Sequence, residues 1–118
     1  MRRDLAPAAV LDVAVLGMGT DGHTASLFPG SPALAPGLEW VRVNTGPTVT
    51  PPDRLTLTAP FLSAARVVAV LVTGPAKRAM LARLAGRAVA PHEAPVSAII
   101  PADGALRWFL DDAAAPPL

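Results

Sequence analysis

A short apolar run that ends in a glycine-rich turn constrains the fold of this chain more than any other feature. The run spans Leu11–Leu16, carries β-branched side chains and stops at Gly17. Apolar runs of this length are typical of strands buried on both faces, as in parallel sheets. A clearer run of the same kind spans Val67–Val72. With helices expected between the strands, the sequence predicts an α/β domain built around a parallel sheet.

Three further strands and two helices follow from the distribution of apolar residues. The expected strands span Val41–Asn44, Arg54–Thr58 and Leu106–Leu110, and the expected helices span Pro60–Ala65 and Pro75–Arg87. Proline suits the first turn of a helix, because its missing N–H is not needed there. In the second helix Lys77, Leu81 and Leu84 share one face. The chain offers few strands to flank Leu11–Leu16, so we expect that some of its sheet partners are missing.

The composition bounds the class of protein. With 118 residues the chain is long enough for one domain with a modest core. It has no cysteine, which excludes a disulfide framework, a thiolate metal site and a cysteine nucleophile. The net charge is +1 and the basic residues form no continuous block, so neither a nucleic acid nor a membrane surface is expected as a partner. Since no apolar run reaches the roughly 18 residues of a membrane span, we expect a cytoplasmic protein.

The loop after the first strand contains the pattern G-x-G-x-x-G, formed by Gly17, Gly19 and Gly22. This pattern after a strand is typical of dinucleotide-binding turns. That fold needs a long helix after the glycines, and Pro29 ends any helix here after about two turns. A nicotinamide or flavin site is therefore disfavoured. Without a long helix, the three glycines still let the backbone approach a ligand closely at the carboxyl end of a strand.

Asp21 and His23 lie in this loop with one glycine between them. Histidine exchanges protons near neutral pH, and a nearby carboxylate can orient one ring nitrogen while the other accepts a proton. A contact between these two side chains is a hypothesis, because residues so close in sequence do not always reach each other. The alternatives are that Asp21 caps a turn and that His23 is an ordinary surface histidine. No metal site is expected, since the other histidine, His92, lies in a remote proline-rich loop.

The stretch GMGTDGHTASLFPG at residues 17–30 resembles the signature of the 6-phosphogluconolactonases. Three later segments resemble the same family: PPDRLTLT at 51–58, VTGPAKRA at 72–79, and the W-x-x-D pattern at 108–111 with the alanines at 113 and 114. The related glucosamine-6-phosphate deaminases share the G-x-G-x-D-G-H core but are expected to continue with IAFNEP. This chain continues with TASLFP, which favours the lactonases. The resemblance implies part of a Rossmann-like parallel-sheet domain of the glucosamine-6-phosphate deaminase/6-phosphogluconolactonase type.

This resemblance also implies an activity, the hydrolysis of 6-phosphogluconolactone to 6-phosphogluconate in the pentose phosphate pathway, with no metal or organic cofactor. By resemblance, His23 is the general base that activates water, and Asp21 orients or polarises it. A positioned base typically contributes about 10²–10⁴ in rate. The backbone of Gly17, Gly19 and Gly22 is expected to stabilise the oxyanion or to hold sugar hydroxyls.

Two cations, Arg54 and Lys77, are the candidates for binding the substrate phosphate. Lys77 is expected in the first turn of a helix, where a cation is disfavoured unless an anion binds at the same terminus. Arg54 can hold a phosphate through two parallel hydrogen bonds. The alternatives are a solvated lysine and a surface ion pair between Arg54 and an acid such as Asp53. The family's lysine before the paired prolines is replaced here by Thr50, which predicts a weaker basic contribution near the phosphate.

The resemblance covers nearly all of residues 1–118 but about half of the family's domain. In the family, an N-terminal half supplies the first strands, a Gly-Gly-Ser/Thr phosphate loop and an Asp-Glu-Arg segment, and none of these appears here. We therefore expect a single partial domain, the C-terminal half, whose protein partner would be a complementing N-terminal half and whose substrate would be a phosphosugar lactone. In isolation, the Leu11–Leu16 strand would have an unpaired edge and exposed apolar surface. A non-catalytic phosphosugar-binding fragment and an amino-sugar phosphate deaminase or isomerase remain the alternatives.

Overall fold

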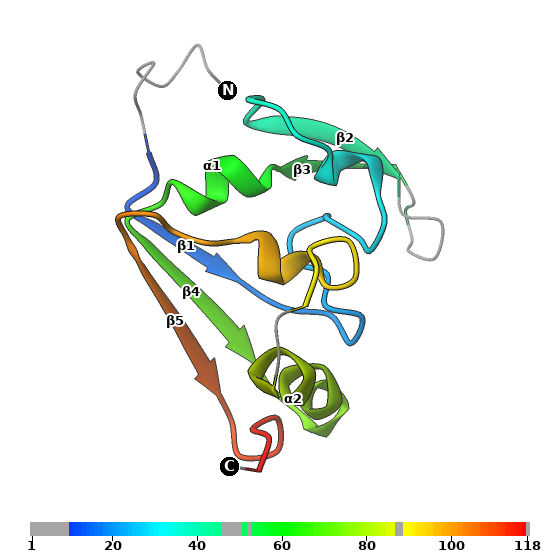
Figure 1. Ribbon diagram of the computed structural model, residues 1–118, viewed down its shortest axis with the longest axis vertical. Helices are drawn as coiled ribbons and strands as arrows, with labels where there is room; N and C mark the ends of the chain where they lie inside the picture. Colours follow the sequence, from blue (N-terminus) through cyan, green and yellow to red (C-terminus); the bar gives the residue numbers. More distant parts are fainter. Residues whose placement is uncertain (1–9, 46–50, 52, 87–88, 118) are drawn as a thin grey trace.

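A computed structural model describes residues 10–45, 51, 53–86 and 89–117, whose strands form two sheets (Figure 1). The first sheet contains three parallel strands in the order β1-β4-β5: β1 (Val13–Leu16), β4 (Val67–Val72) and β5 (Ala105–Leu110). The second pairs β2 (Val41–Thr45) with β3 (Asp53–Leu57) in antiparallel fashion. The predicted α/β class with a parallel sheet is confirmed. All five predicted strands are present, with ends that differ from the prediction by at most two residues.

Within the described ranges, two α-helices and three 3₁₀ turns connect these strands. They are α1 (Ala59–Ser63), α2 (Arg78–Gly86), η2 (Pro32–Leu34), η3 (Pro75–Lys77) and η4 (Pro95–Ala98). Pro60 occupies the first turn of α1, as expected. The helix predicted to start at Pro75 begins instead with the tighter turn η3, and α2 follows it directly. Leu81 is buried and Leu84 packs against the core, as predicted for one face of this helix, whereas Lys77 lies in η3 and outside α2.

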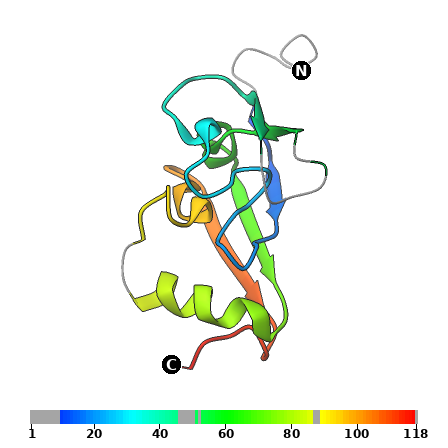
Figure 2. The same cartoon turned by 90° about the vertical axis from the view of Figure 1, so that its right-hand side faces the viewer.

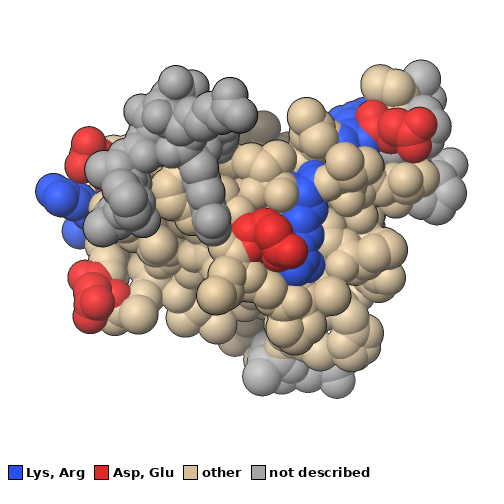
Figure 3. Space-filling view, turned by 90° about the horizontal axis from the view of Figure 1, so that it is seen from above, with Lys and Arg blue, Asp and Glu red and all other residues tan. Residues whose placement is uncertain are grey.

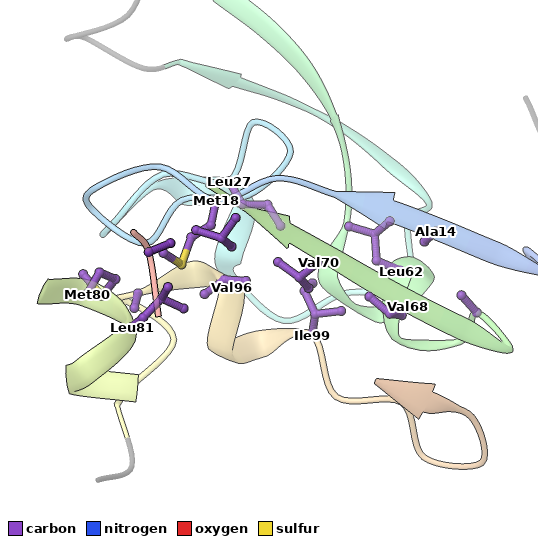
Figure 4. Close-up of a cluster of buried hydrophobic side chains, with 14 of the residues drawn as sticks. Ala14, Met18, Leu27, Leu62, Val68, Val70, Met80, Leu81, Val96 and Ile99 are labelled. Atoms are coloured by element: carbon purple, nitrogen blue, oxygen red, sulfur yellow. The ribbon is translucent and has the colours of Figure 1, made fainter. Parts of the chain in front are cut away.

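The hydrophobic core lies on one face of the parallel sheet. Val68, Val70 and Val72 alternate along β4 and are almost completely buried. Figure 4 shows side chains from the sheet, the loop after β1, both helices and η4 meeting on this face. Leu27 is completely buried and Ile99 is almost completely buried. The segment after β1 and the segment around η4 are therefore integral parts of the core.

The opposite face of the parallel sheet is open. Val13 and Val15 of β1 are 54% and 65% exposed, and Leu71 and Phe109 are also exposed. The prediction that Leu11–Leu16 is buried on both faces is therefore wrong for the described residues, because α2 and η4 both lie on the other side (Figure 2). The predicted unpaired edge and exposed apolar surface are confirmed for the part of the chain that the structure describes, where β1 is an end strand of its sheet.

Charged side chains are scattered over the surface. On the face shown in Figure 3 they form small separate groups in which acidic and basic residues lie next to each other. Arg42 and Glu39 form an ion pair with a nitrogen–oxygen distance of 2.6 Å. Among the described residues, none of the helices has the length and apolar character needed to cross a membrane.

Candidate active site

A tight loop begins where β1 ends, at the carboxyl edge of the parallel sheet. The Gly19 N–H donates to the carbonyl of His23 at 2.8 Å, and the Gly22 N–H donates to the carbonyl of Gly19 at 3.0 Å. Gly22 has a φ of +84°, a conformation that glycine adopts without a steric penalty. These bonds fold residues 19–23 back on themselves. The side chains of the loop are thereby held beside the strand end.

His23 and Asp21 form a direct contact in this loop, as hypothesised from the sequence. His23 Nδ1 lies 2.6 Å from Asp21 Oδ1, and the backbone N–H of His23 donates to the same oxygen at 3.0 Å. Partial burial opposes ionisation of Asp21. However, the hydrogen bonds and the charge of His23 outweigh it and hold the pKa of the Asp21 carboxyl below its ordinary value. Asp21 is therefore an ionised acceptor at neutral pH, suited to receive a proton-bearing Nδ1.

Two further residues fix the orientation of the His23 ring. Phe28 packs against it with ring centroids 5.2 Å apart. Gly19 lies directly beneath the pair, since a Cβ at this position would stand 2.1 Å from His23 Nδ1 and 2.7 Å from Asp21 Oδ1. The glycine at position 19 is thus needed for the close approach of a side chain, even though its own φ is not positive.

A cavity of about 400 Å³ opens beside the loop, within the size range of small-molecule sites. It is lined by Gly17, Met18, Gly19, His23, Thr24, Ala25 and Lys77. Lys77 belongs to η3, which follows β4, the neighbour of β1 in the sheet. Its Nζ donates a hydrogen bond to the Met18 carbonyl. Two adjacent parallel strands therefore bring an imidazole and an ammonium group to one cavity.

Not every residue predicted for the site reaches this cavity. Gly22 packs instead against Ala94, just before η4, and its carbonyl accepts the N–H of Val96 in η4 at 2.9 Å. Arg54 lies on β3, and its Nε donates to the Pro51 carbonyl at 2.8 Å. The structure thus groups Gly17, Gly19, His23 and Lys77 but leaves Asp21, Gly22 and Arg54 outside the lining, with Asp21 reaching the site only through His23. Thr50 lies outside the described residues.

Sequence reasoning did not single out Thr24 and Ala25. The Thr24 hydroxyl is buried and donates to the Gly17 carbonyl at 2.7 Å, which closes the loop at its base. Ala25 has a φ of +50°, an uncommon left-handed conformation for a residue with a Cβ. The position of Thr24 within the family signature was the available signal. Nothing in the sequence indicates the left-handed conformation of Ala25.

Neither a second cavity nor a metal-ligand cluster in the described chain adds a candidate catalytic group. An apolar cavity of about 270 Å³ between α2 and β5 has no titratable residue in its lining. Within the described ranges, no group of three or more histidine, cysteine, aspartate or glutamate side chains is placed to hold a metal ion.

The charge of Asp21 makes a testable contribution to stability. Because its folded-state pKa is lowered, this contribution is present at neutral pH and is lost as pH falls through the ordinary aspartate range toward the lowered pKa. We expect Asp21→Asn to be less stable than the unchanged protein at about pH 7, with a difference that shrinks toward about pH 3. Urea unfolding of both proteins at the two pH values measures this. A difference independent of pH would contradict the account of the pair.

The fold and the loop define an α/β protein with a histidine–aspartate pair and a lysine at the carboxyl edge of its parallel sheet, where such folds bind ligands. The family model described as glucosamine-6-phosphate isomerases/6-phosphogluconolactonase matches residues 1–108. The chain belongs to this family.

Similar proteins carry the lactonase name. The chain is 44% identical to rat (Rattus norvegicus) 6-phosphogluconolactonase over 108 residues, which cover 90% of this chain and 40% of the rat protein. It is 42% identical to the human (Homo sapiens) 6-phosphogluconolactonase over 106 residues, covering 90% of this chain and 41% of that protein. A solved structure of 6-phosphogluconolactonase from Trypanosoma brucei superimposes with a TM-score of 0.75 at 33% identity, covering 88% of this chain and 41% of that one. The chain thus spans about two fifths of the length of these three relatives.

Proposed function

We propose that this chain carries the general-base part of a 6-phosphogluconolactonase, which hydrolyses 6-phosphogluconolactone to 6-phosphogluconate. The observation that carries the proposal is that His23, which is paired with Asp21, lines the same cavity as Lys77. A lactone needs an activated water at its carbonyl carbon, and a phosphorylated sugar needs a cation for its anionic end. The names of the rat, human and Trypanosoma brucei relatives support the same reaction.

His23 is the proposed general base. If Nδ1–H donates to Asp21, the lone pair of the neutral ring lies on Nε2, which takes a proton from water. The hydroxide oxygen bonds to the lactone carbonyl carbon and gives a tetrahedral oxyanion. This collapses as the bond from that carbon to the ring oxygen breaks. The proton on Nε2 then moves to the departing ring oxygen, so that the products are a carboxylic acid and a free hydroxyl, and the acid ionises in water.

Asp21 is the proposed orienting group, because its ionised carboxylate selects the tautomer in which Nδ1 carries the proton. The backbone of Gly17 and Gly19 borders the cavity and is proposed to contact the oxyanion or the sugar hydroxyls. Gly22 is proposed to contribute through the shape of the turn, since it packs away from the cavity.

Lys77 is the proposed phosphate ligand, and Arg54 is a second candidate that would have to act from outside the described cavity lining. We expect Lys77→Ala to raise the KM for the phosphorylated lactone by about 10- to 100-fold with a smaller change in kcat, since a hydrogen bond to a charged group contributes about 1.5–3 kcal/mol. The rate for unphosphorylated gluconolactone provides the control and should change little. An unchanged KM for the phosphorylated substrate would remove Lys77 from the phosphate site.

The open face of the parallel sheet is the proposed docking surface for the complementing part of the domain. The face is largely apolar, no described residue pairs with the outer edge of β1, and the relatives are longer than this chain. A partner that adds a strand along β1 would satisfy the free backbone groups and bury Val13 and Val15. Burial of apolar surface would stabilise the assembled domain by roughly 25 cal/mol for each Å² removed from water.

One assay tests the proposed function and the docking surface together. Hydrolysis of 6-phosphogluconolactone is measured against spontaneous ring opening for the chain alone, for the chain mixed with the part of the rat enzyme that it does not match, and for that part alone. We expect the mixture to exceed both single components. If the chain binds 6-phosphogluconate and no mixture hydrolyses the lactone, the chain is a binding fragment and the catalytic proposal fails. If neither binding nor hydrolysis occurs, the whole proposal fails.

A further inference from the structure

Two buried polar residues of the β2–β3 hairpin contact the segment that follows His23. Asn44 on β2 is 2% exposed, and Thr56 on β3 is 4% exposed. Asn44 is paired with Arg54 and Thr56 with Arg42 in the antiparallel register, so both lie on the same face of the hairpin. Val43 and Leu55, on the opposite face, are largely exposed. The hairpin thus turns its polar side chains inward, the reverse of the usual arrangement of a half-buried strand pair.

Asn44 joins two points of the segment after His23. Its Nδ2 donates to the Ser26 carbonyl at 2.6 Å and to Ser31 Oγ at 3.0 Å. The same Ser31 oxygen accepts the Phe28 N–H at 3.2 Å. Both Nδ2 hydrogens are therefore used, and the amide links Ser26, before Phe28, to Ser31, after it.

Thr56 supplies a second attachment. Its Oγ1 accepts the Ser26 N–H at 3.1 Å and donates to the Leu57 carbonyl at 2.9 Å. The backbone of Ser26 is therefore held on both its N–H and its carbonyl by side chains from a hairpin about 20 to 30 residues away in sequence. Regular secondary structure supplies neither bond.

This network ends at the histidine ring. Phe28, whose N–H is held through Ser31, is itself buried and packs on His23. The position of the imidazole thus depends on Asp21 and Gly19 on one side and on the hairpin, through residues 26–31, on the other. Asn44 Oδ1 is buried and accepts no hydrogen bond from the described residues. An apolar side chain of similar shape would avoid that unpaired oxygen, so the amide at this position costs stability that its role in the loop offsets.

We propose that Asn44 and Thr56 are positioning residues that hold the segment 24–31, and through Phe28 the ring of His23, over the cavity. This inference rests on the proposed general-base function of His23. It assigns the hairpin a part in the site, although neither residue lines the cavity.

The test compares matched valine substitutions within the hairpin region. Thr56→Val removes the acceptor for the Ser26 N–H while keeping the shape of the side chain, and Thr56→Ser keeps the hydroxyl. Thr58→Val is the control, because Thr58 is equally buried and its hydroxyl donates to the Glu39 carbonyl at 2.6 Å, away from the loop. Asn44→Leu removes both donors together with the unpaired oxygen. Each protein is examined by NMR of the His23 ring, by thermal unfolding and by lactone hydrolysis.

We expect Thr56→Val and Asn44→Leu to shift and broaden the His23 ring resonances, and to lower kcat roughly 3- to 10-fold with little change in KM, since small displacements of a reacting group cost rate. Thr56→Ser should restore the ring signal, and Thr58→Val should leave it unchanged even if its melting temperature falls as much as that of Thr56→Val. If Thr56→Val and Asn44→Leu leave the ring resonances unchanged, the positioning role is wrong. It is also wrong if the control Thr58→Val alters these resonances as much as Thr56→Val does. Because the ring signal is read without turnover, an absence of lactone hydrolysis in the mixture with the complementing part would defeat the proposed function and leave this test intact.

Discussion

Replacing His23 with alanine is expected to lower the rate of lactone hydrolysis by about 10²–10⁴-fold, the usual contribution of a positioned general base. The side chain is one-third exposed and its only described side-chain partners are Asp21 and Phe28. Its loss should therefore leave the fold largely intact. The measurement is kcat/KM for 6-phosphogluconolactone, corrected for spontaneous opening, together with a thermal unfolding curve.

His92→Ala is the matched control for this substitution. The side chain of His92 is 72% exposed and lies 3.9 Å from a Glu93 oxygen, and it does not line the cavity. We expect His92→Ala to retain the activity of the unchanged protein. If His23→Ala loses folded protein in proportion to activity, His23 is a structural residue and its catalytic role is contradicted.

Gly19→Ala should disrupt the His23–Asp21 pair without removing either side chain. A Cβ at position 19 would stand 2.1 Å from His23 Nδ1, far inside any normal contact distance, so the imidazole must move. Since a displacement of about 1 Å at a reacting group can cost 10²-fold in rate, we expect a loss of about that size or more. The His23 Nδ1–Asp21 hydrogen bond should be lost as well, which NMR of the ring nitrogens would detect.

Gly86→Ala is the control for the glycine substitution. Gly86 ends α2, its φ is not in the left-handed region, and a Cβ there meets nothing within 4 Å. Alanine should be accepted at this position, with activity unchanged. Retention of full activity in Gly19→Ala would mean that the His23–Asp21 geometry described here is not the one used in hydrolysis.

The strands and the loop after β1 could be predicted because their signals are local. The apolar run at Val67–Val72 defines a strand by itself, and the signature around His23 identifies the loop by residue type and spacing. The Asp21–His23 contact, a hypothesis from the sequence, lies within the same short segment. In each of these cases the residues that decide the structure are neighbours in the chain.

The rest of the site depends on contacts that sequence spacing does not reveal. Arg54 was expected near the phosphate from its motif, but the cavity lining depends on how the hairpin sits against the loop. Asn44 carries no motif at all, and its importance is visible only in its burial and its two hydrogen bonds to residues 26 and 31. The exposure of one face of β1 likewise depends on which elements pack against the sheet. The apolar run at Leu11–Leu16 does not determine that packing.

The central claim is that one phosphosugar ligand contacts both His23 and Lys77 in a single cavity. It is tested most directly by titrating the chain with 6-phosphogluconate, and separately with gluconate, while recording NMR signals of the His23 ring and the Lys77 ammonium group. We predict that 6-phosphogluconate shifts both signals with one dissociation constant and that gluconate binds more weakly, with a smaller effect on Lys77. Saturable binding of 6-phosphogluconate that leaves either signal unmoved would contradict the claim.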